Sequence, residues 1–456
     1  MGIGGTLMGS LALLAKEAGF SVSGFDGTIY PPMSDLLANA EIDPYDHFDP
    51  THLQPPPNLV VVGNANLPRG SEPLEYVLNE KLPYVSGAEW LGTEILKDRQ
   101  VIAVAGTHGK TTTTAMIAWI LSKAGLDPGY LIGGVPINDM VSARLGSGKH
   151  FVVEADEYDT SYFDRRSKFL HYRPNILILS SLEFDHADIF ENLEAIKYQF
   201  QHLIRAIPEN GQIIVPNDHE HIEDVLRRGC WTPVTRYAIS ATNGETVEFS
   251  AENLALDGST FDVIERKHGI RGLVEWNLLG THNVANGLAA LIASHYAGVE
   301  FEAALQHLST FPGVKRRMEV IAQNETTTIY SDFAHHPTAI ATTLNGIRQH
   351  VGSDKVVAVI EPRTHTMSLG TLRDQLKECC GAADEVIWYQ SPTIKWNLEE
   401  LLTDTSQPTK IVTDIDNLVA ELGAPKTQNT HVVVMSNGAF GGIYQKLVDH
   451  FDAEHE

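Results

Sequence analysis

The sequence predicts an α/β protein made of three consecutive α/β domains. Strand-like apolar runs alternate with helical segments along the whole chain, and this alternation starts afresh near residues 98 and 313. With 456 residues, the chain is also too long for a single hydrophobic core. We therefore expect domains at residues 1–97, 98–312 and 313–456.

The composition indicates a soluble globular enzyme, with 43% hydrophobic and 20% charged residues. The net charge of -25 argues against a nucleic-acid partner, because nothing would neutralise a phosphate backbone, yet a single nucleotide can still bind. No apolar run is long enough to span a membrane, and no signal segment opens the chain. Because the only cysteines are Cys230, Cys379 and Cys380, without metal-ligand spacing, we expect a cytoplasmic protein with no membrane partner. The oligomeric state is left open.

The first domain is expected to be Rossmann-like. A glycine-rich turn at residues 1–6 leads into a helix over 7–16 and a strand over 20–26, and a second buried strand follows at 59–62. Glycine turn, helix, strand and a terminal acid are typical of a βαβ unit that binds a nucleotide. The strand that should precede the glycines is missing, so either the chain start is trimmed or the ordered region begins late. A purely structural turn is an equally open interpretation.

The second domain is expected to carry a mostly parallel sheet, because strands and helices alternate along it. We place its strands at 101–105, 151–154, 176–180 and 213–215, and its helices at 112–124 and 192–206. We expect short β pieces between 235 and 276, arranged as a meander, and then a helix from about 279. The third domain is expected to be Rossmann-like again, with strands at 328–331, 356–360, 385–388 and 431–435.

A phosphate-binding loop is the strongest functional signal. The apolar run 101–105 leads into Gly106-Thr-His-Gly-Lys-Thr-Thr112, and a helix follows. In such loops backbone N–H groups and the helix N-terminus face an anion, Lys110 adds a positive charge, and the Thr111 hydroxyl reaches Mg²⁺. The usual spacing needs glycine at position 104, where the chain has Val104. This short form points away from ordinary GTPases and motor ATPases.

Two residues at predicted strand ends are candidate Mg²⁺ ligands. Glu154 ends one predicted strand, and His186 lies just beyond the next. The carboxyl ends of parallel strands meet at one edge of a sheet, beside the phosphate loop. Mg²⁺ prefers oxygen ligands, so Glu154 is the natural choice and His186 a less usual one. A solvated acidic loop and a surface histidine are the alternative.

Polar side chains in two later segments are further candidates. Asn283 and Asn286 stand at a helix start, where they either cap the helix or face an adenine edge. Arg317 belongs to a cationic cluster at the junction of the second and third domains. That cluster is either a solvated linker or a clamp on the γ-phosphate of a nucleotide.

Asp332, His335 and His336 follow a predicted strand near this cationic cluster. A buried histidine pair with satisfied hydrogen bonds is the plain interpretation. Because the segment lies close in sequence to Arg317, we favour an active-site loop.

These motifs together resemble those of the Mur ligase family. The loop 106–111, the segments around Glu154, Asp185-His186, His282-Asn283 with Asn286, Arg316-Arg317, and residues 332–337 occur in that family's order, and the resemblance spans essentially the whole chain. The resemblance implies a UDP-sugar-binding domain, an ATP-binding central domain and a C-terminal peptide-binding domain, in the order of the three domains above.

The resemblance also implies roles for individual residues. ATP is implied to bind Gly106, Thr107, His108, Gly109, Lys110, Thr111, Thr112, Asn283, Asn286, Arg317 and Asp332. The UDP-sugar is implied to bind Gly4, Gly5, Thr6, Asp26 and His335, and the peptide to bind Arg363. The implied metal ligands are Thr111, Glu154 and His186, and the implied catalytic residues are Lys110, His186, Arg317 and His336.

Four further segments are similar to those of the family members that recycle murein tripeptide: residues 166–171, 183–190, 361–363 with 366–367, and 435–442. The implied reaction joins L-Ala-γ-D-Glu-meso-diaminopimelate to UDP-N-acetylmuramate in peptidoglycan recycling, with ATP and Mg²⁺. ATP would phosphorylate the lactyl carboxylate, and the peptide amine would attack the resulting acyl phosphate. His336 or a carboxylate would take the proton of the amine.

The chain departs from the family pattern at two positions. The family often has asparagine where this chain has Ser181. Several members use a carbamylated lysine where this chain has Phe200, and Lys197 stands three residues short of that place. We therefore expect no carbamyl-lysine, and another group or water would serve a second metal.

Three other functions are compatible with the sequence. One is the L-alanine ligase of de novo peptidoglycan synthesis, which acts on the same nucleotide sugar. Another is an ATPase or small-molecule kinase without ligase activity. A third is an inactive UDP-sugar-binding protein, against which the intact Lys110, Thr111, Glu154 and His186 argue.

Overall fold

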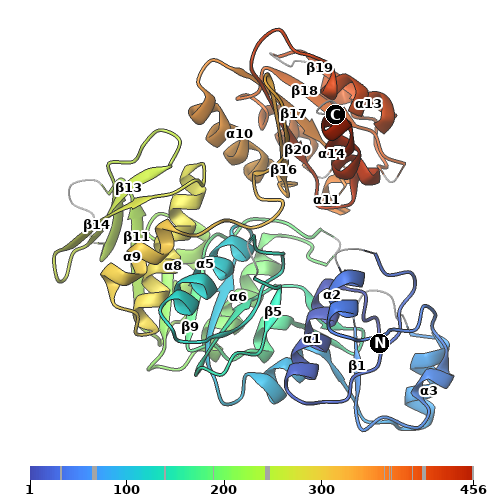
Figure 1. Ribbon diagram of the computed structural model, residues 1–456. Helices are drawn as coiled ribbons and strands as arrows, with labels where there is room; N and C mark the ends of the chain where they lie inside the picture. Colours follow the sequence, from blue (N-terminus) through green and yellow to red (C-terminus); the bar gives the residue numbers. More distant parts are fainter. Residues whose placement is uncertain are drawn as a thin grey trace. The chain divides into compact units, whose positions relative to one another are not determined.

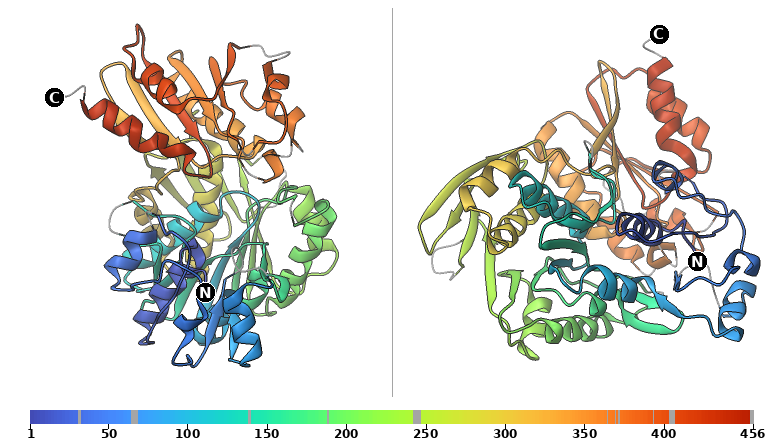
Figure 2. Two further views of the ribbon diagram at one scale, coloured as in Figure 1. Left: turned by 90° about the vertical axis from the view of Figure 1, so that its right-hand side faces the viewer. Right: turned by 60° about the horizontal axis from the view of Figure 1, so that its bottom comes forward.

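The computed structural model describes residues 1–30, 33–63, 69–137, 140–187, 189–241, 247–363, 365–368, 370, 372–392, 394–402 and 407–453. Asp188, within the segment 183–190, lies outside the described residues. Contacts divide the chain into two compact units. The first contains Met1–Leu182, Glu194–Tyr237 and Ala289–Leu308, and the second contains Glu183–Leu193, Ala238–Leu288 and Ser309–Glu456. Figures 1 and 2 show their elements.

The N-terminal part of the first unit contains α1 (Thr6–Glu17), α2 (Met33–Asn39), β1 (Val60–Val62), α3 (Glu72–Asn79), β2 (Tyr84–Ser86) and α4 (Gly87–Trp90). The helix predicted over 7–16 and the strand over 59–62 are confirmed as α1 and β1, and β1 pairs with β2 in parallel. The strand predicted over 20–26 is wrong, because only Phe25 pairs, in a parallel bridge with Tyr45. The serines and glycine that precede Phe25 offer little apolar surface to hold a longer strand.

A mostly parallel sheet forms the centre of the first unit. Its strands are β3 (Gln100–Ala105), β4 (Gly129–Leu131), β5 (Ala143–Arg144), β6 (His150–Glu154), β9 (Ile176–Leu179), β10 (Gln212–Pro216) and β11 (Val234–Ile239). They lie in the order β11-β10-β9-β3-β6-β4-β5. Only the β4–β5 pair among these is antiparallel. The parallel sheet predicted for the central domain is thereby confirmed.

Helices pack on this sheet, which explains why its strands are continuous apolar runs. Residues 101–105 of β3 are at most 1% exposed, as expected for a strand covered on both faces. The helices are α5 (Lys110–Lys123), α6 (Leu193–Ala206), α7 (Glu220–Arg227), α8 (Thr281–Tyr296) and α9 (Phe301–Ser309) (Figure 1). A small antiparallel hairpin pairs β7 (Asp159–Ser161) with β8 (Asp164–Ser167).

The second unit contains an antiparallel meander of β12 (Phe249–Glu252), β13 (Thr260–Glu265) and β14 (Ile270–Glu275). This confirms the short β pieces predicted between 235 and 276. In β13 buried residues alternate with partly exposed ones, and Phe261 and Val263 are fully buried.

A six-stranded sheet carries the rest of the second unit. Its strands are β15 (Glu319–Gln323), β16 (Thr327–Asp332), β17 (Lys355–Ile360), β18 (Glu385–Tyr389), β19 (Thr409–Val412) and β20 (Thr430–Met435). They lie in the order β15-β16-β20-β17-β18-β19, parallel except for β15. The four predicted strands are confirmed, while the half-exposed edge strands β15 and β19 were missed.

Helices cover both faces of this sheet: α10 (Pro337–Val351), α11 (His365–Ser368), α12 (Arg373–Glu378), α13 (Ile415–Gly423) and α14 (Ile443–Ala453). Alternate residues of β17 point to opposite faces. Val356 and Ala358 share a core with Leu344 of α10, whereas Val357 shares a core with Leu447 of α14. Figure 1 shows α10 and α14 on opposite sides of these strands. Among the described residues, no helix has the length and apolar character that a membrane span requires.

Candidate active site

The phosphate loop connects β3 to α5, and its path requires glycine at two positions. Gly106 has a φ of 134° and Gly109 a φ of 80°, both in the region that favours glycine. Space is also short at Gly106, because a Cβ there would collide with the Ser180 hydroxyl and the Ser181 backbone. The chain therefore turns sharply where β3 ends and enters α5 directly.

Ser181, at the end of the neighbouring strand β9, anchors this loop. Its carbonyl oxygen accepts a hydrogen bond from Thr107 N at 3.1 Å, and its hydroxyl accepts one from His108 N at 2.9 Å. Ser181, which replaces the asparagine that the family often has at this position, thus stabilises the loop. The first-turn N–H groups of α5, which begins at Lys110, would face an anion bound in front of the helix.

The Lys110 ammonium is folded back on the loop. It donates to the Gly106 carbonyl oxygen at 2.7 Å and lies 3.5 Å and 3.7 Å from carboxylate oxygens of Glu157 and Asp156. Its side chain is only 11% exposed. A phosphate bound here would meet a lysine that is already ordered, so binding would cost little further side-chain entropy.

Glu154 and Thr111 form an oxygen-rich site beside Lys110. The Thr111 hydroxyl donates to a Glu154 carboxylate oxygen at 3.1 Å, and the other oxygen accepts from Gly133 N at 2.9 Å. Burial raises the pKa of Glu154, and the nearby Asp156 raises it further. A cation would offset both effects, and hard oxygen donors suit Mg²⁺, so these residues fit that ion. Thr112 is buried in the same helical turn.

The N-terminal candidates Gly4, Gly5, Thr6 and Asp26 come together at the start of α1. Asp26 accepts hydrogen bonds from Gly4 N and Gly27 N, each at 2.7 Å. Gly5 is the residue before the first turn of α1, and Thr6 begins the helix. Because Asp26 is only 7% exposed, its carboxylate holds the glycine turn in shape. The helix N-terminus is then positioned for an anionic group.

In the second unit, Asp185 lies among imidazoles. A His186 ring nitrogen lies 3.9 Å from its carboxylate, and His186 itself has a left-handed φ of 57°. Burial alone would raise the pKa of Asp185, but the imidazoles of His186 and His335 outweigh it and lower that pKa. Asp185 is not among the predicted site residues, although its adjacency to His186 is a signal for such a role. The His335 ring nitrogen Nδ1 lies 2.9 Å from the Phe333 carbonyl oxygen.

His336 caps the N-terminus of α10 and contacts Glu183. Its Nδ1 accepts a hydrogen bond from Thr338 N at 3.3 Å and lies 3.6 Å from a Glu183 carboxylate oxygen. The Thr338 hydroxyl donates to the same carboxylate at 2.8 Å. With Nδ1 as acceptor, a neutral His336 carries its proton on Nε2 and offers a donor there. Glu183 is therefore the carboxylate beside this histidine that sequence reasoning did not single out.

Arg317 and Asp332 lie together next to the ring of Phe333. The Arg317 guanidinium carbon is 4.8 Å from the ring centroid. Asp332 accepts hydrogen bonds from Met318 N and Ala334 N, each at 2.8 Å. Burial raises the pKa of Asp332, and Arg317 opposes this rise. Asp332 thus ties the segment around Arg317 to the end of β16.

The two asparagines at the start of α8 contact each other. Asn283 donates from its amide to the Leu279 carbonyl oxygen at 2.8 Å, and Asn286 donates to the Asn283 amide oxygen at 3.3 Å. Both side chains are at most 9% exposed. Neither contact caps the helix, because in an N-cap the side-chain oxygen accepts a hydrogen bond from a backbone N–H. An adenine contact would have to use the remaining amide groups.

Arg363, which is predicted to bind the peptide, follows β17 at the carboxyl edge of the six-stranded sheet. Its guanidinium lies so close to Gly438, just after β20, that a Cβ at position 438 would collide with it. The intervening Glu361 is buried and accepts a hydrogen bond from the Ser436 hydroxyl at 2.5 Å. Ends of neighbouring strands β17 and β20 thus meet at this edge, where α/β sheets commonly bind ligands.

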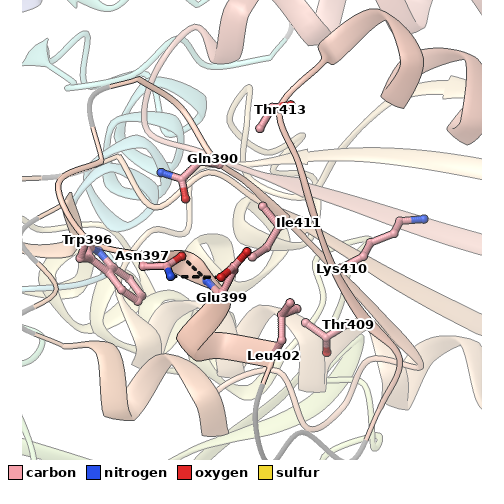
Figure 3. A pocket seen from close by; sticks show the side chains of 9 residues that line it. All are labelled: Gln390, Trp396, Asn397, Glu399, Leu402, Thr409, Lys410, Ile411 and Thr413. Carbon is pink, nitrogen blue, oxygen red and sulfur yellow. Dashed lines mark hydrogen bonds between the residues drawn. The ribbon is translucent and has the colours of Figure 1, made fainter.

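A separate pocket lies along the edge strand β19 (Figure 3). It is lined by Gln390, Trp396, Asn397, Glu399, Leu402, Thr409, Lys410, Ile411 and Thr413. None of the residues predicted for the active site belongs to this lining. Asn397 and Glu399 hydrogen bond to each other, as the dashed lines show.

The predicted residues are divided between the two units. The first unit brings Gly106–Thr112 next to Glu154, with Gly4–Thr6 and Asp26 around α1. The second unit contains the remaining candidates, which are His186, Asn283, Asn286, Arg317, Asp332, His335, His336 and Arg363.

Comparisons with known proteins give consistent matches. The family models that match are the Mur ligase family catalytic domain over residues 1–99, the Mur ligase middle domain over 104–294 and the Mur ligase glutamate ligase domain over 316–438. Together they confirm the predicted fold class, three α/β domains with a mostly parallel central sheet.

Individual proteins match over nearly the whole length. The chain is 45% identical over 450 residues to the UDP-N-acetylmuramate–L-alanyl-γ-D-glutamyl-meso-2,6-diaminoheptandioate ligase of Escherichia coli, covering 98% of this chain and 97% of that one. It is 43% identical over 451 residues to the protein of the same name in Haemophilus influenzae, covering 98% of each. A solved structure of a murein peptide ligase from Psychrobacter arcticus is 42% identical, with a TM-score of 0.75 over 99% of this chain and 97% of that one.

Proposed function

The chain belongs to the Mur ligase family, and on that premise we propose that it joins L-Ala-γ-D-Glu-meso-diaminopimelate to UDP-N-acetylmuramate at the expense of ATP. The observation that carries this proposal is the identity of 43–45% over 98% of the chain to two ligases named for that reaction. The reaction would return murein tripeptide to nucleotide precursors in the cytoplasm, where ATP is present.

We keep the boundaries 1–97, 98–312 and 313–456 as part of the proposal. The three family matches support these boundaries, because the first match ends at residue 99, the second covers 104–294 and the third begins at 316. The first domain would hold the UDP-sugar through Gly4, Gly5, Thr6 and Asp26, with His335 contributing from the third. The second would hold ATP, and the third would receive the peptide.

The phosphate loop supports the assignment of ATP. Lys110 is ordered at the loop, and α5 begins at the same residue, so a charge and a helix N-terminus act on one anion. In the proposal Lys110 and Arg317 offset charge on the transferred phosphoryl group. Asn283, Asn286 and Asp332 would position the nucleoside.

Mg²⁺ would be held by Thr111 and Glu154, whose oxygens already lie 3.1 Å apart, and His186 would serve a second ion. When bound, Mg²⁺ would supply positive charge against the phosphate oxygens. Apart from that charge, the side chains of this chain would contribute by positioning the reacting groups. We do not include a carbamyl-lysine, because Lys197 pairs with Glu194 and Asp224, each at 3.0 Å.

The reaction sequence follows from carboxylate chemistry. A carboxylate is a poor acyl donor, because oxide would have to leave. Transfer of the γ-phosphoryl group to the lactyl carboxylate gives an acyl phosphate, the neutral peptide amine attacks its carbonyl carbon, and phosphate leaves. For the proton of the amine we favour a carboxylate such as Glu183 over His336, whose Nδ1 already accepts a hydrogen bond. Arg363 would pair with a peptide carboxylate.

The decisive experiment measures ADP release with UDP-N-acetylmuramate and either the tripeptide or L-alanine as acceptor. We expect faster turnover with the tripeptide. Turnover only with L-alanine would make the chain an L-alanine ligase, and ADP release without any acceptor would favour an ATPase or kinase.

A matched pair of lysine variants tests the nucleotide assignment. Lys110→Ala should lower ADP release at least about 100-fold, because it removes the charge at the phosphates. Lys123→Ala, at the other end of the same helix, should leave the rate unchanged. Unchanged ADP release in Lys110→Ala would overturn the assignment of the loop.

A further inference from the structure

The segment that carries Arg317 has an unusual backbone on both sides of that residue. Arg316 has a φ of 59° and Met318 a φ of 53°, in the left-handed region that side chains rarely adopt. Two hydrogen bonds hold this shape: Arg316 N donates to a Glu319 carboxylate oxygen and Met318 N to an Asp332 carboxylate oxygen, each at 2.8 Å. The surrounding structure therefore holds Arg317 in one place.

The Arg316 guanidinium points away into the loop that follows β20. One of its terminal nitrogens donates to the carbonyl oxygens of Ser436 at 2.6 Å and Gly438 at 2.7 Å. Its central carbon lies 5.3 Å from the Phe333 ring centroid and 4.9 Å from that of Tyr444, so cation–π contacts add to the hydrogen bonds.

The loop 436–438 is in turn the support of Arg363. The Ser436 hydroxyl accepts from Gly438 N at 2.9 Å and donates to Glu361 at 2.5 Å. Gly438 lies directly against the Arg363 guanidinium. A displacement of the two carbonyls that Arg316 holds would therefore displace the surface on which Arg363 rests.

The same aromatic ring also contacts Arg317. Phe333 lies 4.8 Å from the Arg317 guanidinium carbon and 5.3 Å from that of Arg316. Adjacent arginines thus share one ring, while their chemical environments differ: Arg317 faces Asp332, and Arg316 faces backbone carbonyls.

We propose that Arg316 is a positioning residue that holds the peptide-side loop 436–438 in register with Arg317. It would act through Gly438 on the acceptor site and touch neither ATP nor peptide itself. The inference rests on the proposed function, because it assigns the peptide to Arg363 and the γ-phosphate to Arg317.

The test is Arg316→Lys, which keeps the charge but loses the planar fork. We expect the KM for tripeptide to rise about tenfold, the size of one lost charge-assisted hydrogen bond, while the KM values for ATP and UDP-N-acetylmuramate stay within about twofold. The ratio of ADP released to amide formed should also rise, because a misplaced amine leaves the acyl phosphate to water.

Arg348→Lys is the matched control. Arg348 also holds backbone carbonyls of the second unit, at Gly352 and Asp354, but near the opposite ends of the strands. It should leave all three KM values and the ADP-to-amide ratio unchanged. If Arg316→Lys folds poorly, Tyr444→Leu removes one aromatic neighbour of Arg316 and should give the same selective change, only smaller.

Two results would overturn the proposal. One is a folded Arg316→Lys enzyme with the wild-type KM for tripeptide and the wild-type ADP-to-amide ratio. The other is an equal rise of all three KM values, which marks a general structural effect. A wild-type enzyme that does not use the tripeptide at all would instead refute the proposed function, so the two failures are distinguishable.

Discussion

Replacing Gly106 by alanine tests whether the shape of the phosphate loop, and not only its charge, determines nucleotide binding. The change adds one methyl group at the point where β3 turns into the loop. It leaves Lys110, Thr111 and Glu154 in the chain. Any loss of nucleotide affinity would then come from geometry.

The expected loss in the free energy of unfolding has two contributions. A φ of 134° is a conformation that alanine avoids, at a cost of roughly 1–3 kcal/mol. The new Cβ would also lie 2.8 Å from Ser181 O and 2.9 Å from Ser181 N, and backbone atoms cannot swing aside as a flexible side chain can. The loop must shift, which breaks the hydrogen bonds from Thr107 and His108 to Ser181, about 1 kcal/mol each. We expect the free energy of unfolding to fall by about 3 kcal/mol.

The assay combines calorimetric titration with a non-hydrolysable ATP analogue and urea unfolding. We expect Gly106→Ala to weaken analogue binding at least about tenfold, because displaced amides no longer face the phosphates. The control is Gly125→Ala at the other end of α5, where φ is 74° and nothing lies within 4 Å of an added Cβ. That variant should lose about 1 kcal/mol of stability and no affinity.

The outcome that refutes this reasoning is clear. Wild-type affinity in Gly106→Ala would mean that the loop adapts to the methyl group at no cost to binding. An equal loss of affinity in Gly125→Ala would mean that general destabilisation, and not the loop geometry, weakens nucleotide binding.

Three further predictions concern single side chains. Glu154→Gln should raise the Mg²⁺ concentration needed for half-maximal ADP release at least about tenfold, because an anionic oxygen ligand is lost; an unchanged Mg²⁺ titration would contradict the metal assignment. Within the described part of the chain neither ring nitrogen of His150 has a hydrogen-bond partner, so His150→Phe should raise the free energy of unfolding by about 1 kcal/mol. Burial lowers the pKa of His150 below its ordinary 6.5. As the pH falls through 6.5, the unfolded chain therefore binds a proton that the folded chain does not, and the stability of the wild type falls. Urea unfolding should show that the free energy of unfolding falls less between about pH 7.5 and about pH 5.5 in His150→Phe than in the wild type. Lys197→Met should retain activity within about twofold, since its partners are Glu194 and Asp224 at the surface of α6 and α7, and added bicarbonate should not change the wild-type rate; a bicarbonate-dependent rate would point to a carbamyl-lysine.

Much of the fold could be predicted because the signals are local. Strands such as β3 and β17 are continuous apolar runs, since a parallel sheet covered by helices buries both of their faces. The edge strands β15 and β19 were missed, because every residue of each is at least partly exposed and no continuous apolar run marks them. The strand predicted over 20–26 is wrong because the serines and glycine before Phe25 have little apolar surface to bury, and only Phe25 forms a bridge, with Tyr45.

The sequence by itself determined the phosphate loop and its chemistry. Gly106, Lys110 and Thr111 stand within six consecutive residues, so their spacing already places them around one anion. Asp185 could also have been assigned a role, since it stands next to His186. The resemblance to the Mur ligase family then assigned roles to further residues that no local sequence pattern connects.

Only the tertiary structure decided which distant residues hold the site in shape. Ser181 anchors a loop that lies more than 70 residues earlier in the chain, and Arg316 holds carbonyls at Ser436 and Gly438. Such contacts depend on strand order and on the register of each pair, which bring the ends of β3 and β9, or of β17 and β20, side by side. A hydrogen bond between side chain and backbone has no periodicity along the sequence, so it becomes visible only when the chain is folded.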